Sequence, residues 1–157
     1  MMLLTYLALA AASPETRLPP AQALPPPATD EQALLAPINA LFAAMLAKDG
    51  AAILANSRAD GRLTGVSDAG AKSRSWAEFA AQFKPGEGPA LKEQLVGAPA
   101  IEIDGDIAMV WSSYVFTIDG KFSHCGIDHF DLVRDPGGQW KLLNLTWSKR
   151  TTGCPTP

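Results

Sequence analysis

The chain has 157 residues, a formal net charge of −3 and 47% hydrophobic residues. This charge is spread without blocks, so we expect neither a nucleic-acid-binding surface nor attraction to an anionic membrane. No stretch is long enough to cross a bilayer as a helix. The length that remains after the N-terminal segments described next suits one domain with a single core.

The N-terminal region predicts export. Residues 1–12 form an uncharged apolar run, and small residues at Ala10 and Ala12 allow a cleavage site, as in a short signal peptide. The alternative is an apolar tail that arises from a wrongly assigned start codon. Residues 13–29 are dense in proline, which favours an extended linker. The folded domain is therefore predicted to cover residues 30–155, in a periplasmic or secreted protein.

Helices are predicted first along the chain. Thr29 and Asp30 are suitable N-caps, and Pro37 either kinks the first helix or marks where its regular part begins. Residues 51–56 form a short second helix. The first helix is recognised by an apolar stripe at three- and four-residue spacing, made of Leu34, Leu35, Ile38, Leu41, Phe42, Met45 and Leu46.

The middle of the chain predicts a weak strand, a third helix and a longer strand. The weak strand covers residues 62–66. Ser75 and Glu78 have the spacing of a capping box, which predicts a helix over residues 76–83. A strand over residues 91–103 follows, with a break near Gly97.

Three alternating runs at the C-terminus, residues 107–118, 121–133 and 139–149, predict antiparallel strands. Asp119-Gly120 between the first two is a typical type I′ hairpin turn, and residues 135–138 form a second turn. Helices followed by antiparallel strands indicate the α+β class.

The chain has two cysteines, Cys125 within a predicted strand and Cys154 beyond the last one. They pair in an oxidising compartment, or they are two unrelated thiols in a cytosolic protein. The predicted export and the even number favour a disulfide.

The domain resembles the nuclear transport factor 2-like superfamily, which includes SnoaL-like cyclases and ketosteroid isomerases, and within it the small exported bacterial members. The resemblance covers about residues 30–155. It implies a cone: a strongly curved sheet wrapped over helices, with a pocket at the wide end and often a dimer partner on the other face. We therefore expect a homodimer. The motifs that carry the resemblance are Asp119-Gly-Lys-Phe-Ser-His-Cys-Gly126, Phe130-x-Leu132-x-Arg134, Gln139-Trp-Lys-Leu142 and Arg150-Thr-Thr-Gly-Cys-Pro155.

Regular pairing outward from the Asp119-Gly120 turn places His124 opposite Val115 and Asp128 opposite Trp111. One face of the sheet then carries Trp111, His124, Asp128 and Phe130, and we take it as the pocket face. The superfamily's enzymes use an Asp or His base together with a Tyr or a second acid. In this register, however, Tyr114 lies on the opposite face.

Asp128 is the candidate general base, because an apolar site disfavours the charged form of a carboxyl group. The alternative, which is the commoner case for a carboxylate, is a structural role in which Asp128 accepts hydrogen bonds from the neighbouring backbone, Asn144 or Thr146. His124 is the second candidate catalytic residue. It shares the face of Asp128 but lies roughly 13 Å away along an unbroken strand, unless Gly126 hosts a bulge. Trp111, Phe130 and Asn144 are the predicted ligand-binding residues.

A metal site is not expected, because alternation points His124 and Asp128 to one face and Cys125 and His129 to the other. Three functions stay open: binding of a small apolar molecule, cofactor-independent catalysis with Asp128 as base, and a dimerisation or interaction module. A shared fold does not choose among them.

Overall fold

The computed structural model describes residues 28–155, so the predicted signal peptide and nearly all of the predicted linker lie outside the described residues. The helices are α1 (Ala28–Ala47), α2 (Gly50–Asn56) and α3 (Trp76–Ala80). The strands are β1 (Arg62–Ser67), β2 (Gly70–Ser75), β3 (Leu91–Asp104), β4 (Ile107–Ile118), β5 (Lys121–Arg134) and β6 (Trp140–Ser148).

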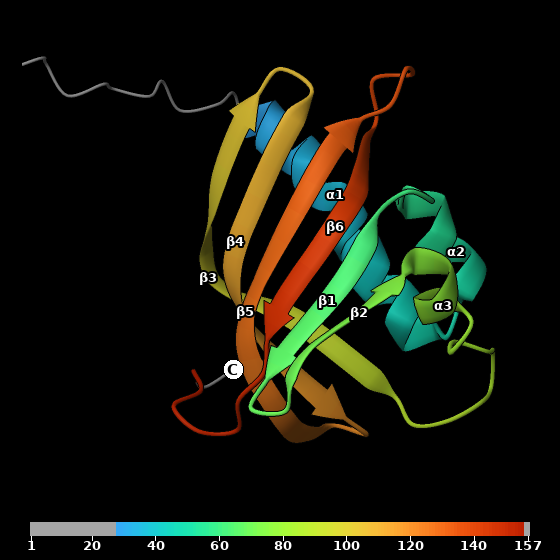
Figure 1. Ribbon diagram of the computed structural model, residues 1–157, viewed down its shortest axis with the longest axis vertical. Coiled ribbons are helices and arrows are strands. Elements are labelled where there is room, and N and C mark those ends of the chain that lie inside the picture. The colour runs from blue at the N-terminus through green and yellow to red at the C-terminus, as the bar shows by residue number, and fades with distance from the viewer. Residues whose placement is uncertain (1–27, 156–157) are drawn as a thin grey trace, which may run out of the picture.

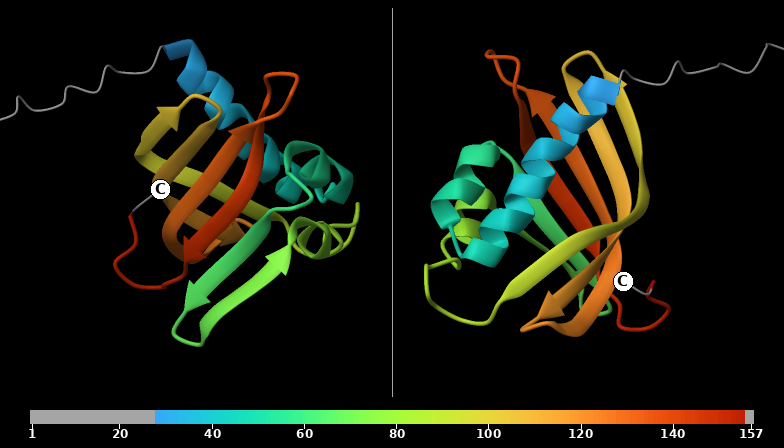
Figure 2. Two further views of the ribbon diagram at one scale, coloured as in Figure 1. Left: turned by 45° about the horizontal axis from the view of Figure 1, so that its top comes forward. Right: turned by 180° about the vertical axis from the view of Figure 1, so that it is seen from behind.

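All six strands form one sheet in the order β2-β1-β6-β5-β4-β3. Neighbouring strands are antiparallel except β1 and β6, which are parallel. The sheet is strongly curved, with α1 running diagonally across one face and α2 and α3 beside β1 and β2 (Figures 1 and 2). This arrangement confirms the predicted α+β cone. None of the helices in the described part of the chain is long and apolar enough to cross a membrane.

The helix starts follow the sequence prediction only in part: α1 begins at Ala28, so the predicted caps Thr29 and Asp30 lie within its first turn, and the cap of α2 was not predicted. Asp49 caps α2 by accepting a hydrogen bond from the Ala52 backbone N–H at 2.9 Å. Before α3, the Glu78 carboxylate accepts from the Ser75 backbone N–H at 2.7 Å, and the Ser75 hydroxyl accepts from the Glu78 N–H at 3.2 Å. The predicted capping box is thus confirmed, and it satisfies donors that a helix start leaves unpaired.

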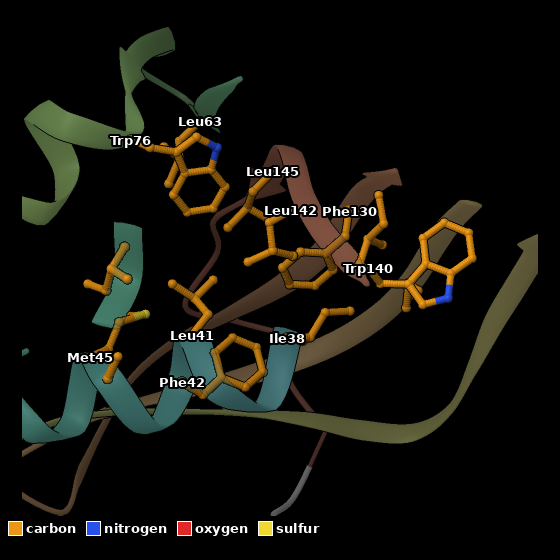
Figure 3. Close-up of a cluster of buried hydrophobic side chains, with 14 of the residues drawn as sticks. Ile38, Leu41, Phe42, Met45, Leu63, Trp76, Phe130, Trp140, Leu142 and Leu145 are labelled. Carbon is orange, nitrogen blue, oxygen red and sulfur yellow. The ribbon is translucent and has the colours of Figure 1, made fainter. Parts of the chain in front are cut away.

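The core lies between α1 and the concave face of the sheet (Figure 3). The predicted stripe of α1 supplies its fully buried Leu34, Ile38 and Leu41, and α1 continues through a buried Pro37. Phe42 meets Phe130 of β5 edge to face, with ring centroids 6.2 Å apart. This contact ties the longest helix to the centre of the sheet.

One strand, β2, differs from the sequence prediction, whereas the predicted break in β3 is present. β2 was not predicted, because its exposed and mostly polar residues show no apolar alternation; it pairs with β1 as a hairpin. β3 is interrupted as predicted: its register against β4 shifts between Val96 and Ala100, and Gly97 has a φ of 80°. A positive φ suits glycine, which has no Cβ.

The β4–β5 hairpin begins as predicted, with Ile118 opposite Lys121 across the Asp119-Gly120 turn. One pair later a β-bulge occurs: Thr117 pairs with Phe122, but Phe116 pairs with His124. The bulge gives β5 one extra residue, which reverses the side-chain alternation relative to β4. The predicted register beyond the turn was therefore wrong, and Ser112 rather than Trp111 lies opposite Asp128.

The shifted register redistributes the predicted pocket face. The inner, helix-covered face carries Ser112, Tyr114 and Phe116 of β4 together with His124, Asp128 and Phe130 of β5. Tyr114 is 1% exposed there, whereas Trp111 is 49% exposed on the outer face. Trp111 was thus wrongly predicted on the pocket face, and Tyr114 was wrongly predicted on the opposite face. Both errors come from the one extra residue of the bulge.

A disulfide joins Cys125 of β5 to Cys154, which lies in the segment after β6. Backbone hydrogen bonds join the same two regions: the Cys125 N–H donates to Arg150 O at 3.0 Å, and the Arg150 N–H donates to Cys125 O at 2.9 Å. The pairing favoured from the sequence is therefore present, and it holds the C-terminal segment against the sheet.

Candidate functional site

A cavity of about 320 Å³ lies on the inner face of the sheet, near the C-terminal end of α1 and beside α3. Aromatic side chains, other apolar side chains and several polar groups form its wall. Its apolar and aromatic lining consists of Met45, Leu63, Phe79, Phe83, Leu91, Phe116, Leu145 and Trp147. Its polar lining consists of Arg74, Gln82, Glu93, Tyr114, His124, Asp128 and Lys149. Small-molecule sites typically combine a mostly apolar wall with a few polar groups.

Asp128 is fully buried on β5, at the back of this cavity. Within residues 28–155, neither of its carboxylate oxygens receives a hydrogen bond from a donor group. Burial raises the pKa of Asp128 well above its usual value, and the nearby charge of Glu93 raises it further. The predicted alternative, a structural carboxylate satisfied by its neighbours, does not fit a side chain that lacks donors.

Glu93 of β3 lies on the same face and was not predicted as a site residue. Its side chain is partly accessible because it lines the cavity, yet burial raises its pKa to about 7. The alternation Leu91, Glu93, Leu95 was the available signal, since it places an acid within an apolar stripe.

The carboxyl group of Glu93 is close enough to that of Asp128 for its charge to raise the Asp128 pKa. Two carboxylates only accept hydrogen bonds, so a bond between them requires a proton on one of them. Burial and mutual repulsion favour a proton on one member of the pair, and the titration belongs to the pair rather than to either residue. Such a pair offers a ligand both a donor and acceptors.

Tyr114 borders the acid pair and is held rigidly. Its hydroxyl donates a hydrogen bond to the Ser148 carbonyl at 2.8 Å. Gly126, opposite Tyr114 in the sheet, makes this possible: a Cβ there would lie 1.9 Å from the Ser148 oxygen and 2.8 Å from the Tyr114 ring. Burial, with the charges of Glu93 and Asp128, raises the pKa of Tyr114, so the phenol stays protonated.

His124 lies on the cavity wall as a neutral ring. It stacks on Phe116 with centroids 4.7 Å apart, and its Nδ1 is 3.0 Å from the Ser123 hydroxyl. Burial and then the positive charge of Lys149 lower its pKa to about 4. At neutral pH this imidazole is therefore a flat, uncharged surface with hydrogen-bonding edges.

The profile of one protein family, described as "Putative lumazine-binding", matches residues 29–148. The chain belongs to this family. Similar solved structures agree on the fold, and their proteins are described as nuclear transport factor 2-like or as having a cystatin-like fold. The predicted membership in the nuclear transport factor 2-like superfamily is thus confirmed. No curated protein matches the chain.

Three solved structures illustrate the similarity. A nuclear transport factor 2-like protein of Salmonella enterica serovar Typhimurium is 19% identical with a TM-score of 0.62, over 82% of this chain and 97% of that one. A Nostoc punctiforme protein of unknown function is 15% identical with a TM-score of 0.63, over 82% and 96%. A "putative ketosteroid isomerase" of Shewanella frigidimarina is 20% identical with a TM-score of 0.54, over 74% and 94%. Identities this low show a common fold.

In this nuclear transport factor 2-like domain, three of the predicted site residues lie away from the cavity. Phe130 is fully buried in the core, and Trp111 packs beside His129 on the outer face, with ring centroids 5.7 Å apart. Asn144 accepts from the Arg62 N–H and donates to Asp131. Of the five predicted catalytic and ligand-binding residues, the structure brings only Asp128 and His124 to the cavity. No group of three metal-ligating side chains occurs within residues 28–155.

Proposed function

We propose that the protein binds a small, flat, largely apolar molecule in the cavity and holds its polar edge with Glu93 and Asp128. The observation that carries this proposal is the fully buried carboxyl group of Asp128, whose two oxygens have no hydrogen-bond partner within the described residues. A buried polar group without a partner costs free energy. A ligand with adjacent N–H and C=O groups would remove that cost.

The wall of the cavity supports a flat ligand. Phe116 and His124 present one stacked aromatic surface, and Trp147 presents another. Gly65 lets the Trp147 ring lie directly on β1, since a Cβ there would come within 2.6 Å of it. The family description names lumazine, a flat bicyclic compound whose edge alternates N–H and C=O groups. A carboxyl pair with one proton has the donor and acceptors to match such an edge.

The proposal is tested first by native mass spectrometry of the protein purified from the exported fraction, and then by calorimetric titration with lumazine. We expect an extra mass that leaves on denaturation, and lumazine binding that weakens at least tenfold in Asp128→Asn, which corresponds to the roughly 1.5–3 kcal/mol of a charge-assisted hydrogen bond. The control His129→Gln alters a side chain of the outer face and should bind as the wild type does. Absence of any bound mass together with absence of lumazine binding would refute the proposal.

A second candidate is proton transfer at carbon. It is favoured by the pKa of Glu93, about 7, because a base that titrates near the working pH is effective. The ionised member of the pair would remove a proton next to a carbonyl group and return it to a second carbon, while the protonated member donates to the carbonyl oxygen. No cofactor is needed. Proton exchange into a cyclic ketone in D₂O, followed by NMR and lost in Asp128→Asn, would identify this activity.

We further propose that the protein is a homodimer whose subunits meet through the outer face of the sheet. That face exposes Trp111 and Ile107, at 49% and 59%. A mainly apolar depression of about 400 Å³ adjoins them; its lining includes Met109, Val133 and Leu143 together with the acids Glu102, Asp104 and Asp131. A contiguous apolar surface on a monomer is typical of an interface.

The Trp111→Lys variant is therefore expected to be monomeric, because it introduces a charge into a surface that the partner would desolvate. Light scattering coupled to size-exclusion chromatography measures the mass of both proteins. Lys84→Gln, an exposed change in the segment after α3 and away from the outer face of the sheet, serves as the control. A wild-type protein that elutes as a monomer at high concentration would exclude the dimer.

Export is also proposed. Its support is the apolar N-terminal run of residues 1–12 together with the disulfide between Cys125 and Cys154. Disulfides persist in oxidising compartments such as the periplasm. Cell fractionation with detection of a shortened mature chain would test this localisation.

A further inference from the structure

The cavity has charge of opposite sign at its two sides. The acids come from β3 and β5, whereas Arg74 comes from β2 and Lys149 directly follows β6. In the strand order β2-β1-β6-β5-β4-β3, the cations thus belong to one flank of the sheet and the acids to the other. A ligand that spans the cavity meets both.

Arg74 is fixed in place while its charge stays available. It pairs with Leu63 of β1, whose fully buried side chain is in the core, so Arg74 lies on the inner face. Its guanidinium lies over the Phe79 ring, 6.0 Å from the centroid. In the described part of the chain, its side chain makes no salt bridge or hydrogen bond. The nearby Glu78 carboxylate accepts hydrogen bonds from Ser75, which lower its pKa, and the charge of Arg74 lowers that pKa further.

Lys149 is held by its backbone, since its N–H donates to Val66 O at 2.9 Å. It continues the inward alternation of Leu145 and Trp147, which both line the cavity. The positive charge of its ammonium group is close enough to contribute to the lowered pKa of His124. It is exposed, and within residues 28–155 its ammonium has no ion-pair partner.

We propose that the positive charges of Arg74 and Lys149 attract an anionic group of the ligand to their half of the cavity, so the natural ligand is a flat ring compound with a carboxylate or a similar anion at one end. This inference rests on the proposed binding function. The orientation follows from the charges: the anion is attracted to the cationic flank and repelled by the ionised member of the acid pair. The neutral polar edge of the ring then points toward Glu93 and Asp128.

The alternative is that both cations are ordinary solvated charges on the surface and contribute nothing to ligand binding. Many surface charges contribute nothing to binding, and exposed pairs are worth little individually. A matched pair of probes separates the two roles, because only an anion-binding flank distinguishes a charged probe from a neutral one of equal shape.

The probes are naphthalene-2-carboxylate and its neutral amide, titrated calorimetrically into the wild-type protein and into Arg74→Gln/Lys149→Gln at neutral pH and low salt. We expect the wild type to bind the carboxylate about five- to tenfold more tightly than the amide, from two partly exposed charge contacts. The double variant should bind the two probes equally and keep its affinity for the amide. Unchanged amide binding also shows that the variant is folded. Lys92→Gln, which removes a charge from β3 outside the cavity, should retain the wild-type preference.

Each outcome has a separate meaning. If the wild type binds the amide as tightly as the carboxylate, the anionic flank is refuted and the proposed binding function stands. If the double variant retains the preference for the carboxylate, Arg74 and Lys149 are refuted as its source. If neither probe binds, this inference fails, and the binding function is decided separately by the native mass spectrum and the lumazine titration.

Discussion

The Glu93→Gln variant should be more stable than the wild-type protein at pH 8 and nearly equal to it at pH 4. In the folded protein the pKa of Glu93 is raised from 4.5 to about 7 by burial, so the folded state holds the proton more tightly than the unfolded state. Stability must then fall as the pH rises from about 4.5 to about 7, because the unfolded state binds fewer protons in this range. Above pH 7 the difference is constant.

The size of the effect follows from the shift. A change of one pKa unit corresponds to about 1.4 kcal/mol, so at most roughly 3 kcal/mol of unfolding free energy separates the variant from the wild type at pH 8. Glutamine removes the buried charge and supplies N–H donors to Asp128, whose oxygens have none within the described residues. For a domain of this size the melting temperature should increase by about 10 °C.

Thermal unfolding measured from pH 4 to pH 8 provides the test, with the difference between variant and wild type as the quantity of interest. Titrating groups that do not interact with Glu93 cancel in that difference, so what remains is the titration of the pair with Asp128. Glu102→Gln, an exposed acid of the same strand, is the matched control and should follow the wild type at every pH. Parallel curves for Glu93→Gln and the wild type would show that Glu93 does not retain a proton in the folded state.

Most of the fold could be predicted from the sequence because local signals agreed with the final packing. The Asp119-Gly120 turn has positive φ at both residues, 49° and 74°, as a type I′ turn requires. The capping box at Ser75 and the break in β3 near Gly97 are equally local. β2 was missed because a polar edge strand shows no apolar alternation: its presence depends on β1, which only the folded structure supplies.

The site was predicted less well, and one bulge explains much of this. Asp128 and His124 were found because both belong to one strand, where alternation alone places them on a common face. Assigning Tyr114 and Trp111 required the register between two strands, and the bulge opposite Phe116 inverts it. The pattern of residues 116–124 does not indicate an extra residue, because a bulge is a feature of the pairing between two strands and not of one strand alone. Glu93, in contrast, could have been identified from its own alternation.

Loss of the disulfide should have the largest effect on stability of any change outside the core. Cys125 and Cys154 close a loop with a sequence separation of 29 residues. On the chain-entropy model, removing a crosslink of this length destabilises the folded state by roughly 3.5 kcal/mol, mainly by freeing the unfolded chain. We expect this loss for Cys154→Ser under oxidising conditions. Cys154 is the better residue to change, because the remaining Cys125 is fully buried and tolerates burial as a thiol.

Urea unfolding of wild type and Cys154→Ser, each with and without a phosphine reductant, measures this effect. The reductant should lower the wild-type stability to that of the variant and leave the variant unchanged. Equal stability of all four samples would show that the crosslink contributes nothing.

Loss of the disulfide should affect ligand binding much less than it affects stability. The backbone hydrogen bonds between Cys125 and Arg150, and that from Lys149 to Val66, do not depend on the sulfur atoms. The Tyr114 hydroxyl likewise keeps its bond to Ser148. The cavity wall is therefore held in the folded variant, and its affinity for a probe such as naphthalene-2-carboxylate should stay within about twofold of the wild type, because a disulfide acts chiefly on the unfolded state. A large loss of affinity in a sample that is still folded would instead mean that the disulfide itself shapes the cavity.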